Sequence, residues 1–330
     1  MERLYRTVVQ IEVAKETIQR GDLAHLRVAL ILLDNAVEVM MHRVIKDELF
    51  HAEWYERMLR TFPTGPLDPK GEELRTDMAS HVISRRRREE IRRYFGAKVD
   101  FLSDRDRIPR PSARALKHLH NYRNETQHED LVREESIRAV VMLLFDMTTN
   151  FLLRLKTGST SWRGGADYSW VQKYGIESPR LFFGSEEMGQ HIARQLRADL
   201  PLDDTELRNS LIVHLTERLD AMEGQLDYVR ENMELKDSAE ALRNVQFWKS
   251  SPGYVDPAKL SSFVARHDLA SIAKWRAGVE ALNSIADKLD RFDQFATIED
   301  DFEPLERMID DVVGAIDEQI QLAIDIARGK

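Results

Sequence analysis

The segment from residue 117 to 130, KHLHNYRNETQHED, contains three side chains that could together cleave a phosphodiester. Arg123 and Asn124 are followed by His128. A guanidinium can bind a phosphate through parallel hydrogen bonds and stabilise the charge that develops in the transition state. An imidazole titrates near neutral pH, so it can accept a proton from one reacting oxygen or donate one to another. These residue types could therefore hold and cleave a phosphodiester, or they could be three polar positions on the surface of a helix.

The spacing by itself is not specific. An arginine precedes a histidine by four or five intervening residues at five places, namely Arg20 and His25, Arg75 and His81, Arg114 and His120, Arg123 and His128, and Arg208 and His214. Requiring asparagine directly after the arginine leaves two motifs, RNETQH and RNSLIVH.

The alternative motif consists of Arg208, Asn209 and His214. It opens a predicted helix whose neighbouring leucines and isoleucine are explained by packing, and no basic segment leads into it. The RNETQH motif is therefore favoured as the catalytic one.

The charge distribution also favours the first motif. Residues 1–157 contain 28 Lys and Arg against 25 Asp and Glu, a net charge of +3, whereas the rest of the chain has 20 against 32, a net charge of −12. Within the first part, residues 75–123 hold 14 basic and 6 acidic side chains. This basic segment leads directly into Arg123, as binding to a polyanion requires.

The elements that must position these residues are helices. Apolar residues recur at spacings of three and four, and neither a glycine-rich phosphate loop nor strand alternation appears. An up-and-down bundle is the expected way to bury five such apolar faces. The first expected helix covers residues 2–20, and a long second one begins at residue 23. The third covers residues 72–95 and is ended by Gly96. The fourth begins at Ser112, which can cap it, and contains the motif, and the fifth covers residues 133–156.

The remainder of the chain is predicted to be a separate all-α part. Residues 158–184 are rich in glycine and aromatic residues and are expected to form an ordered connector. Residues 185–330 are expected to form an acidic regulatory or dimerisation domain. A coiled-coil-like stripe from Ile212 to Met233 is suited to a helical hairpin or to a subunit contact. Further helices are expected at 258–295 and 303–328, separated by an acidic turn at 299–301.

The motif and its setting resemble the HEPN domains (higher eukaryotes and prokaryotes nucleotide-binding). LHNYRNETQHED precedes an apolar helix, and ALILLDNAVEVMMHRVI is similar to the second helix of that family, with an acidic residue among apolar ones. The resemblance covers residues 1–157. It implies a helical bundle and a metal-independent ribonuclease that acts as a dimer. It also implies catalysis by Arg123 and His128, with His128 exchanging a proton with the ribose 2′-OH or the leaving 5′-oxygen and Asn124 orienting the arginine or the backbone. A toxin or phage-defence role is suggested by the resemblance alone.

Helix geometry adds a constraint. Five residues at about 100° each separate Arg123 from His128 by about 140° on an uninterrupted α-helix. The two side chains would therefore converge only if the helix ends near His128 or if a second subunit completes the site. Asp34 and Glu38 share one face of the second helix, so one of them could support Arg123, or both could be the polar flank of that helix.

Further arginines and a lysine are candidates for binding the RNA backbone. The acids at 89 and 90 could instead pair with the first of these arginines and leave a salt-bridged, solvated face. The candidates are Arg85, Arg86, Arg87, Arg88, Arg92, Arg93, Arg114 and Lys117.

No cofactor or metal is expected. The chain lacks cysteine, and His118 and His120 point about 200° apart on a helix, with no well-placed acidic ligand between them. The first twenty residues lack the apolar core of a signal peptide, and no window approaches the roughly 20 apolar residues that span a bilayer. These features predict a soluble, cytoplasmic protein without a membrane partner.

The expected partners are an RNA substrate, a second copy of the chain and an antitoxin or regulatory protein. Some HEPN toxins carry a tyrosine two residues after the histidine that a partner enzyme modifies, but here that position is Asp130 and the nearest tyrosine is Tyr122. Control by that route is not expected. The alternative function is a non-catalytic helical protein that binds RNA or a nucleotide, or that acts as a scaffold.

Overall fold

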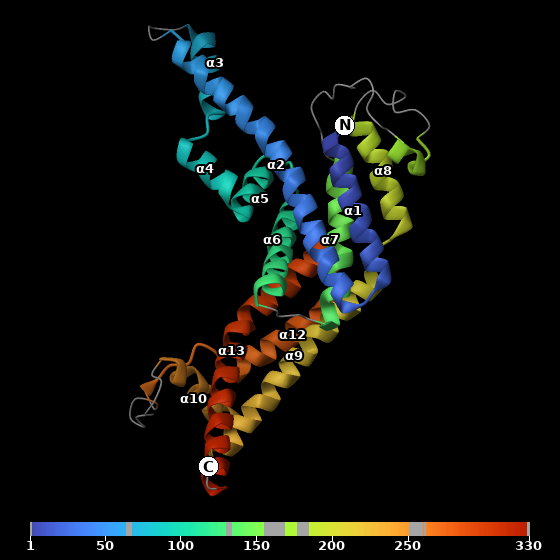
Figure 1. Cartoon of the computed structure of the whole chain (residues 1–330). Helices are drawn as coiled ribbons and strands as arrows, with labels where there is room; N and C mark the ends of the chain where they lie inside the picture. The colour runs from blue at the N-terminus through green and yellow to red at the C-terminus, as the bar shows by residue number, and fades with distance from the viewer. Residues whose placement is uncertain are drawn as a thin grey trace. The chain divides into compact units, whose positions relative to one another are not determined.

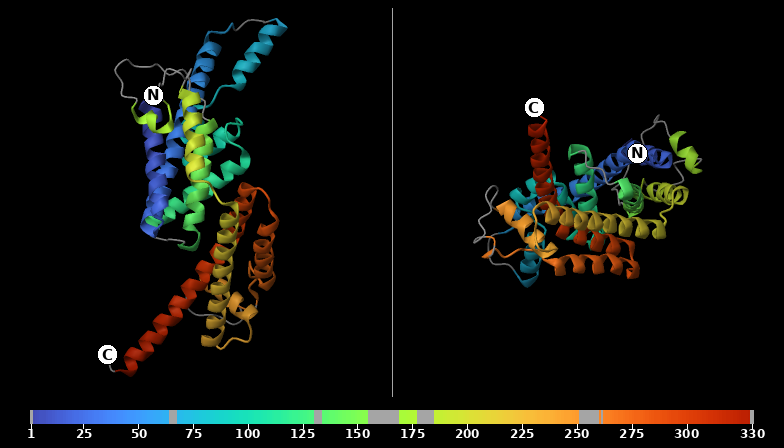
Figure 2. Two further views of the ribbon diagram at one scale, coloured as in Figure 1. Left: turned by 90° about the vertical axis from the view of Figure 1, so that its right-hand side faces the viewer. Right: turned by 90° about the horizontal axis from the view of Figure 1, so that it is seen from below.

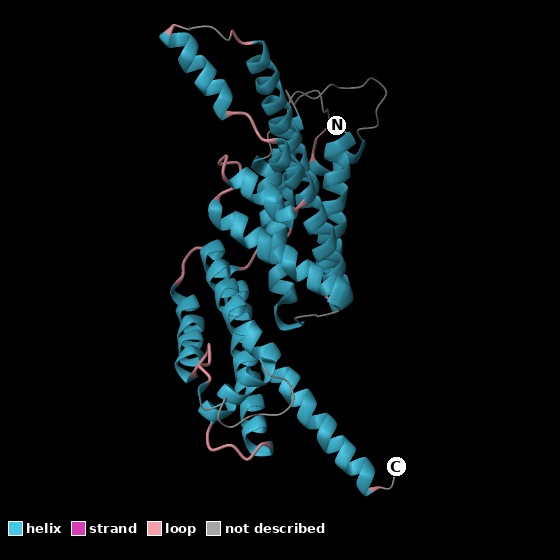
Figure 3. Cartoon of the chain, turned by 90° about the vertical axis from the view of Figure 1, so that its left-hand side faces the viewer, coloured by secondary structure: helices cyan, strands magenta, loops and turns pink. Residues whose placement is uncertain are grey.

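The chain is all-α. The computed structural model describes residues 2–63, 68–129, 134–154, 169–176, 185–250, 260 and 262–328, and these contain twelve α-helices and no strand (Figure 3). The chain divides into two compact units, Met1–Asp203 and Asp204–Lys330. This division lies one helix beyond the boundary predicted at residue 184.

Four helices form the bundle of the first unit. They are α1 (Glu2–Arg20), α2 (Leu23–Thr61), α7 (Glu134–Arg154) and α8 (Ser185–Asp199). Figures 1 and 2 show them side by side, with α7 in contact with each of the other three. Because α8 packs on α7 and α1, the bundle extends beyond the predicted limit at residue 157. The prediction of a first helix over residues 2–20 is confirmed.

Helix α7 is the central apolar element of this unit. The segment Ser136–Arg154 is long and apolar enough to cross a membrane by length and composition alone, which differs from the expectation that no window would be. However, 78% of that window is buried inside the protein. Burial against three neighbouring helices accounts for its apolar character, as expected for the core helix of a bundle.

The predicted single helix at 72–95 is wrong. The structure has three helices there, α3 (Pro69–Ser80), α4 (Arg85–Arg93) and α5 (Phe95–Ser103). Ser84 starts α4 by accepting a hydrogen bond from the backbone N–H of Arg87, and Tyr94 adopts an extended conformation between α4 and α5. Gly96 lies in the first turn of α5, so it does not end a helix.

Helix α6 (Arg110–Asn124) carries the Arg123 motif. Its N-cap is Pro109, with no side-chain cap, so the prediction that Ser112 begins the helix is also wrong. A second proline stands in its first turn, where the missing N–H costs no intrahelical hydrogen bond. Helices α5 and α6 pack against each other, and both contact α2. This arrangement brings the motif beside the second helix of the bundle.

The second unit is built on two long helices, α9 (Asp204–Asn232) and α13 (Lys288–Ala327), with α10 (Ser238–Ser250) and α12 (Leu269–Ala281) packed on both. The stripe predicted from Ile212 to Met233 lies on α9, and its central residues, from Leu215 to Val229, are buried. The stripe therefore packs within this unit, as the helical-hairpin alternative expects.

The acidic turn predicted at 299–301 is wrong, because α13 continues through it and through Pro304. The acids are accommodated by partners on neighbouring helices. Glu299 is buried and accepts a hydrogen bond from Arg218 of α9, while Asp301 accepts one from Nε1 of Trp275 at 2.8 Å. The acids thus fix the packing of α13 and do not interrupt the helix.

The turn between α1 and α2 gives a test of the first unit. Gly21 has φ of +79°, a left-handed conformation that costs a residue with a Cβ about 1–2 kcal/mol. We expect Gly21→Ala to lower the free energy of unfolding by about 1 kcal/mol.

Gly96 is the matched control, because a Cβ there meets no atom within 4 Å and its φ is not positive. Gly96→Ala should be neutral or stabilising by up to about 1 kcal/mol. Urea unfolding of both variants measures this, and equal losses would contradict the assigned backbone.

Candidate functional site

The centre of the candidate site is the carboxylate of Asp34 on α2. This side chain is only 3% exposed, although it lies among apolar residues of the helix. Its Oδ1 and Oδ2 are 3.0 Å and 3.1 Å from Nδ1 of His120, and its Oδ2 is 3.5 Å from Nε of Arg123. A buried carboxylate is tolerated when cationic or hydrogen-bonding groups surround it. The carboxylate of Asp34 therefore contacts both His120 and Arg123 of α6.

The spacing on α6 explains why these two side chains meet the same carboxylate. His120 and Arg123 are three residues apart, so they are neighbours on one face of the helix. The apolar residues Leu116 and Leu119 of the same helix are buried in the unit. Packing of α6 on α2 therefore turns the polar face toward Asp34.

The guanidinium of Arg123 is held on two sides. Its Nη1 donates to Oδ1 of Asn124 at 3.0 Å, and its Nε is fully buried beside Asp34 without a hydrogen bond. The amide oxygen of Asn124 therefore restricts one end of the guanidinium. Within the described part of the chain Nη2 has no hydrogen-bond partner and is not among the fully buried unpartnered atoms. The side chain of Arg123 is 23% exposed, so the surface of the unit includes part of it.

The imidazole of His120 is fixed by its ring and by one nitrogen. The ring stacks on Phe95 of α5 with centroids 3.8 Å apart and planes 2° from parallel. While Nδ1 contacts Asp34, Nε2 has no hydrogen-bond partner among the described residues and is not a fully buried unpartnered atom. Asp34 and Phe95 therefore anchor the ring, while the side chain remains 19% exposed.

Glu38 lies one turn after Asp34 on α2 but makes a different contact. Its Oε1 accepts from Nζ of Lys98 on α5 at 2.8 Å. Lys98 is 4% exposed, so this ion pair satisfies a buried ammonium group. Of the two acids considered as support for Arg123, the structure places Asp34 beside it and engages Glu38 with Lys98.

A change of helix type follows the motif. α6 ends at Asn124, and the chain continues as η1 (Glu125–Glu129), a single π-helical turn. In a π turn the hydrogen bonds join residues five apart instead of four, so residues five apart approach one face. The backbone thus departs from the uninterrupted α-helix that would separate Arg123 from His128 by about 140°. The side chain of His128 lies outside the described residues.

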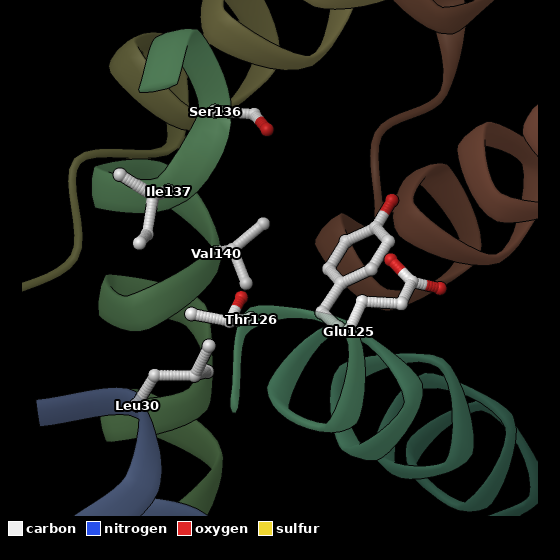
Figure 4. Close-up of a pocket in the computed structure, with 7 residues that line it drawn as sticks. Leu30, Glu125, Thr126, Ser136, Ile137 and Val140 are labelled. Carbon is white, nitrogen blue, oxygen red and sulfur yellow. The ribbon is translucent and has the colours of Figure 1, made fainter. Parts of the chain in front are cut away.

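The π turn is attached to the bundle. Nη2 of Arg27 on α2 donates to the carbonyl oxygen of Thr126 at 2.8 Å. A pocket lies between this turn, α2 and α7 (Figure 4), and its volume of about 10 Å³ is close to the minimum that one water molecule requires. Ser136 on α7 lines it, with a buried Oγ that has no protein partner among the described residues. A nucleotide cannot enter this space, so RNA would have to approach the exposed side of Arg123.

Most of the candidate RNA-binding side chains are engaged with acids. Arg85 pairs with Glu89 at 3.0 Å, Arg86 with Glu90 at 3.1 Å, Arg87 with Glu90 at 3.5 Å, Arg88 with Glu56 at 2.7 Å, Arg92 with Glu53 at 3.2 Å, and Lys117 with Asp100 at 2.5 Å. Arg93 lies over the ring of Tyr94, and Arg114 is exposed on α6. The pairs from Arg88 and Arg92 attach α4 to α2. The structure therefore favours the salt-bridged alternative for α4.

The alternative motif is dispersed on α9. His214 is 3% exposed, and its Nε2 lies 3.3 Å from Oε1 of Glu299, which Arg218 also contacts. Asn209 is exposed, and Arg208 has a buried Nε without a hydrogen-bond partner among the described residues. His214 thus belongs to a buried ionic contact between α9 and α13, which is a structural role.

Sequence reasoning did not select three members of the site. His120 was identified only as a possible metal ligand and as one of the five matches to the bare spacing, and Phe95 and Lys98 were not selected. The position of His120 three residues before Arg123 could have identified it, because that spacing shares a helix face. Among the described residues, no group of three or more His, Cys, Asp or Glu side chains is arranged to hold a metal ion.

Comparison with known proteins adds no assignment. No protein-family model matches the chain, and no curated protein or solved structure is similar to it.

The structural role of His214 is testable. His214→Ala removes one partner of a buried carboxylate, so we expect the free energy of unfolding to fall by about 2 kcal/mol. Asn209→Ala, at an exposed position of the same motif, should change it by less than about 0.5 kcal/mol. Urea unfolding monitored by circular dichroism compares the two. Equal effects would argue against a buried contact at His214.

Proposed function

We propose that this chain is a metal-independent endoribonuclease of the HEPN type. The observation that carries the proposal is the cluster of Asp34, Arg123 and Asn124, in which a buried carboxylate and an amide hold a guanidinium whose Nη2 is accessible. Restricting an arginine in this way reduces the entropy lost when it binds a phosphate. The resemblance of residues 1–157 to HEPN domains supplies the reaction class.

In the proposed reaction Arg123 binds the scissile phosphate and stabilises the extra negative charge of the pentacoordinate transition state. Asn124 keeps the guanidinium in place. His128 transfers a proton to or from the ribose oxygens, and the π turn that contains it supports this role by altering the helical angle to Arg123. No step requires a metal ion or a cofactor.

We propose an HEPN-like up-and-down bundle in the first unit and a homodimer as the active assembly. The second unit is the proposed site of regulation or of partner recognition. Residues 1–203 contain 33 basic and 31 acidic side chains, whereas residues 204–330 contain 15 and 26. An antitoxin or regulatory protein with a basic surface would suit this second unit. The proposed RNA is cellular or from an invading phage.

The second candidate function is a non-catalytic helical protein that binds RNA or serves as a scaffold. The paired arginines of α4 and the buried contact of Asp34 with α6 favour the scaffold role, since both stabilise helix packing. Loss of activity on mutation separates the two functions.

Cleavage of RNA in the presence of EDTA tests the proposal. Purified wild-type protein should cut total RNA to fragments with 2′,3′-cyclic phosphate ends, because attack by the 2′-OH needs no metal. Arg123→Ala should reduce the rate about 100- to 1,000-fold, the usual effect of losing one charge-stabilising donor. Sequencing of adaptor-ligated fragments after treatment of the cyclic ends measures this.

Two arginine variants serve as controls. Arg307→Ala removes an exposed arginine of α13 that pairs with Glu303 of its own helix, so the rate should be unchanged. Arg208→Ala tests the alternative motif and should also cleave normally. The proposal fails if the pure wild-type dimer leaves RNA intact, or if Arg123→Ala cuts as fast as wild type.

A further inference from the structure

We propose that His120 is a second catalytic histidine of this site and acts as the general base, with Asp34 as its positioning residue. This inference rests on the proposed endoribonuclease function. It is suggested by the contact of Asp34 with Nδ1 of His120 at 3.0 Å and by the accessible Nε2 on the opposite side of the ring.

The carboxylate determines which nitrogen can accept a proton. A carboxylate beside Nδ1 favours the tautomer in which Nδ1 carries the hydrogen and donates it to Asp34. Nε2 is then the lone-pair nitrogen. The same arrangement of carboxylate and imidazole orients the base in hydrolytic triads.

Two further contacts restrict the ring to one orientation. Its stacking on Phe95 at 3.8 Å limits rotation, and the carboxylate that it contacts also lies 3.5 Å from Arg123. Because residues three apart on a helix have Cβ atoms about 5–6 Å apart, one nucleotide can contact both side chains. Nη2 of Arg123 would bind a phosphate oxygen while Nε2 of His120 meets the adjacent 2′-OH.

The proposed step balances without a co-reactant. Nε2 of His120 accepts the 2′-OH proton, the 2′-oxygen forms a bond to phosphorus, and the bond from phosphorus to the 5′-oxygen breaks. The 5′-oxygen takes one proton from water, and Nε2 then returns its proton to the hydroxide left in solution, so the products are a 2′,3′-cyclic phosphate and a 5′-OH. The imidazolium formed is stabilised by the adjacent Asp34 carboxylate.

A purely structural role is the competing hypothesis, because an Asp–His contact between two helices also stabilises packing. The two roles differ in accessibility. His214 is accounted for by packing, because its side chain is 3% exposed, whereas the side chain of His120 is 19% exposed. His120 keeps one nitrogen accessible beside a cationic side chain. This difference favours catalysis at His120.

The test compares wild type with His120→Gln on the shortest RNA that wild type cuts at one mapped bond. A second substrate carries sulfur in place of the leaving 5′-oxygen, since a thiolate leaves without protonation. We expect His120→Gln to be at least about 100-fold slower, the lower range for losing a general base. The loss should be equal on both substrates.

The affinity for RNA distinguishes a loss of catalysis from a loss of structure in His120→Gln. An uncleavable RNA with a 2′-O-methyl group at the mapped position should bind His120→Gln and wild type with the same affinity. If His120→Gln does not fold, His120→Ala is assayed with added imidazole, which should restore part of the rate. Absence of rescue in the folded alanine variant would overturn the assignment.

Other outcomes also decide the question. An unchanged rate for His120→Gln on both substrates would leave the ribonuclease standing and overturn the role of His120. Full recovery on the sulfur substrate would make His120 the acid and not the base. Inactive wild type would instead overturn the ribonuclease, and with it this inference.

Discussion

The candidate site depends on one buried carboxylate. Asp34 is an acidic residue within the apolar stripe of α2, and its burial is tolerated because α6 presents His120 and Arg123 to it. His120 and Arg123 depend on Asp34 in the same way. Without Asp34, the imidazole would lose the group that fixes its tautomer, and the guanidinium would lose the charge beside its buried Nε. The contacts that stabilise the buried carboxylate of Asp34 therefore also hold His120 and Arg123, the two groups that the proposed reaction uses.

Neighbouring elements leave one side of the cluster accessible. Phe95 covers a face of the His120 ring, and Asn124 holds one end of the Arg123 guanidinium. Glu38 and Lys98 form a separate ion pair between α2 and α5. The remaining nitrogens, Nε2 of the histidine and Nη2 of the arginine, are the groups that a ribose and a phosphate need. The proposed chemistry follows from which atoms the packing leaves without partners in the described structure.

Helical periodicity was sufficient to predict the all-α class, because apolar residues at spacings of three and four are typical of helices that bury one face. It could not locate the breaks at Ser84 and Tyr94, since a run of arginines and glutamates is compatible with one continuous helix. It also placed a turn at 299–301, where α13 continues. The acids there looked exposed in sequence, but Glu299 is buried against Arg218. Such pairings across distant helices cannot be read from local spacing.

The site was predictable only in part for the same reason. Arg123 and Asn124 were chosen from their adjacency, and their contact at 3.0 Å is local. The partner on α2 had two candidates, and only the packing of α6 distinguishes Asp34 from Glu38. His120 could not be connected with Arg123 through Asp34, because Asp34 and His120 are 86 residues apart in the sequence. The sequence also gave no sign of the π turn after Asn124. The angle of about 140° between Arg123 and His128 was calculated for an uninterrupted α-helix, which the chain does not form there.

A structure of the protein with an uncleavable 2′-O-methyl RNA tests the central claim most directly. The account predicts an oxygen of the scissile phosphate within about 3 Å of Nη2 of Arg123 and the adjacent 2′-oxygen facing Nε2 of His120. Asp34 should keep its contacts with both side chains. RNA bound only along the arginines of α4, with the Asp34 cluster unoccupied, would contradict it.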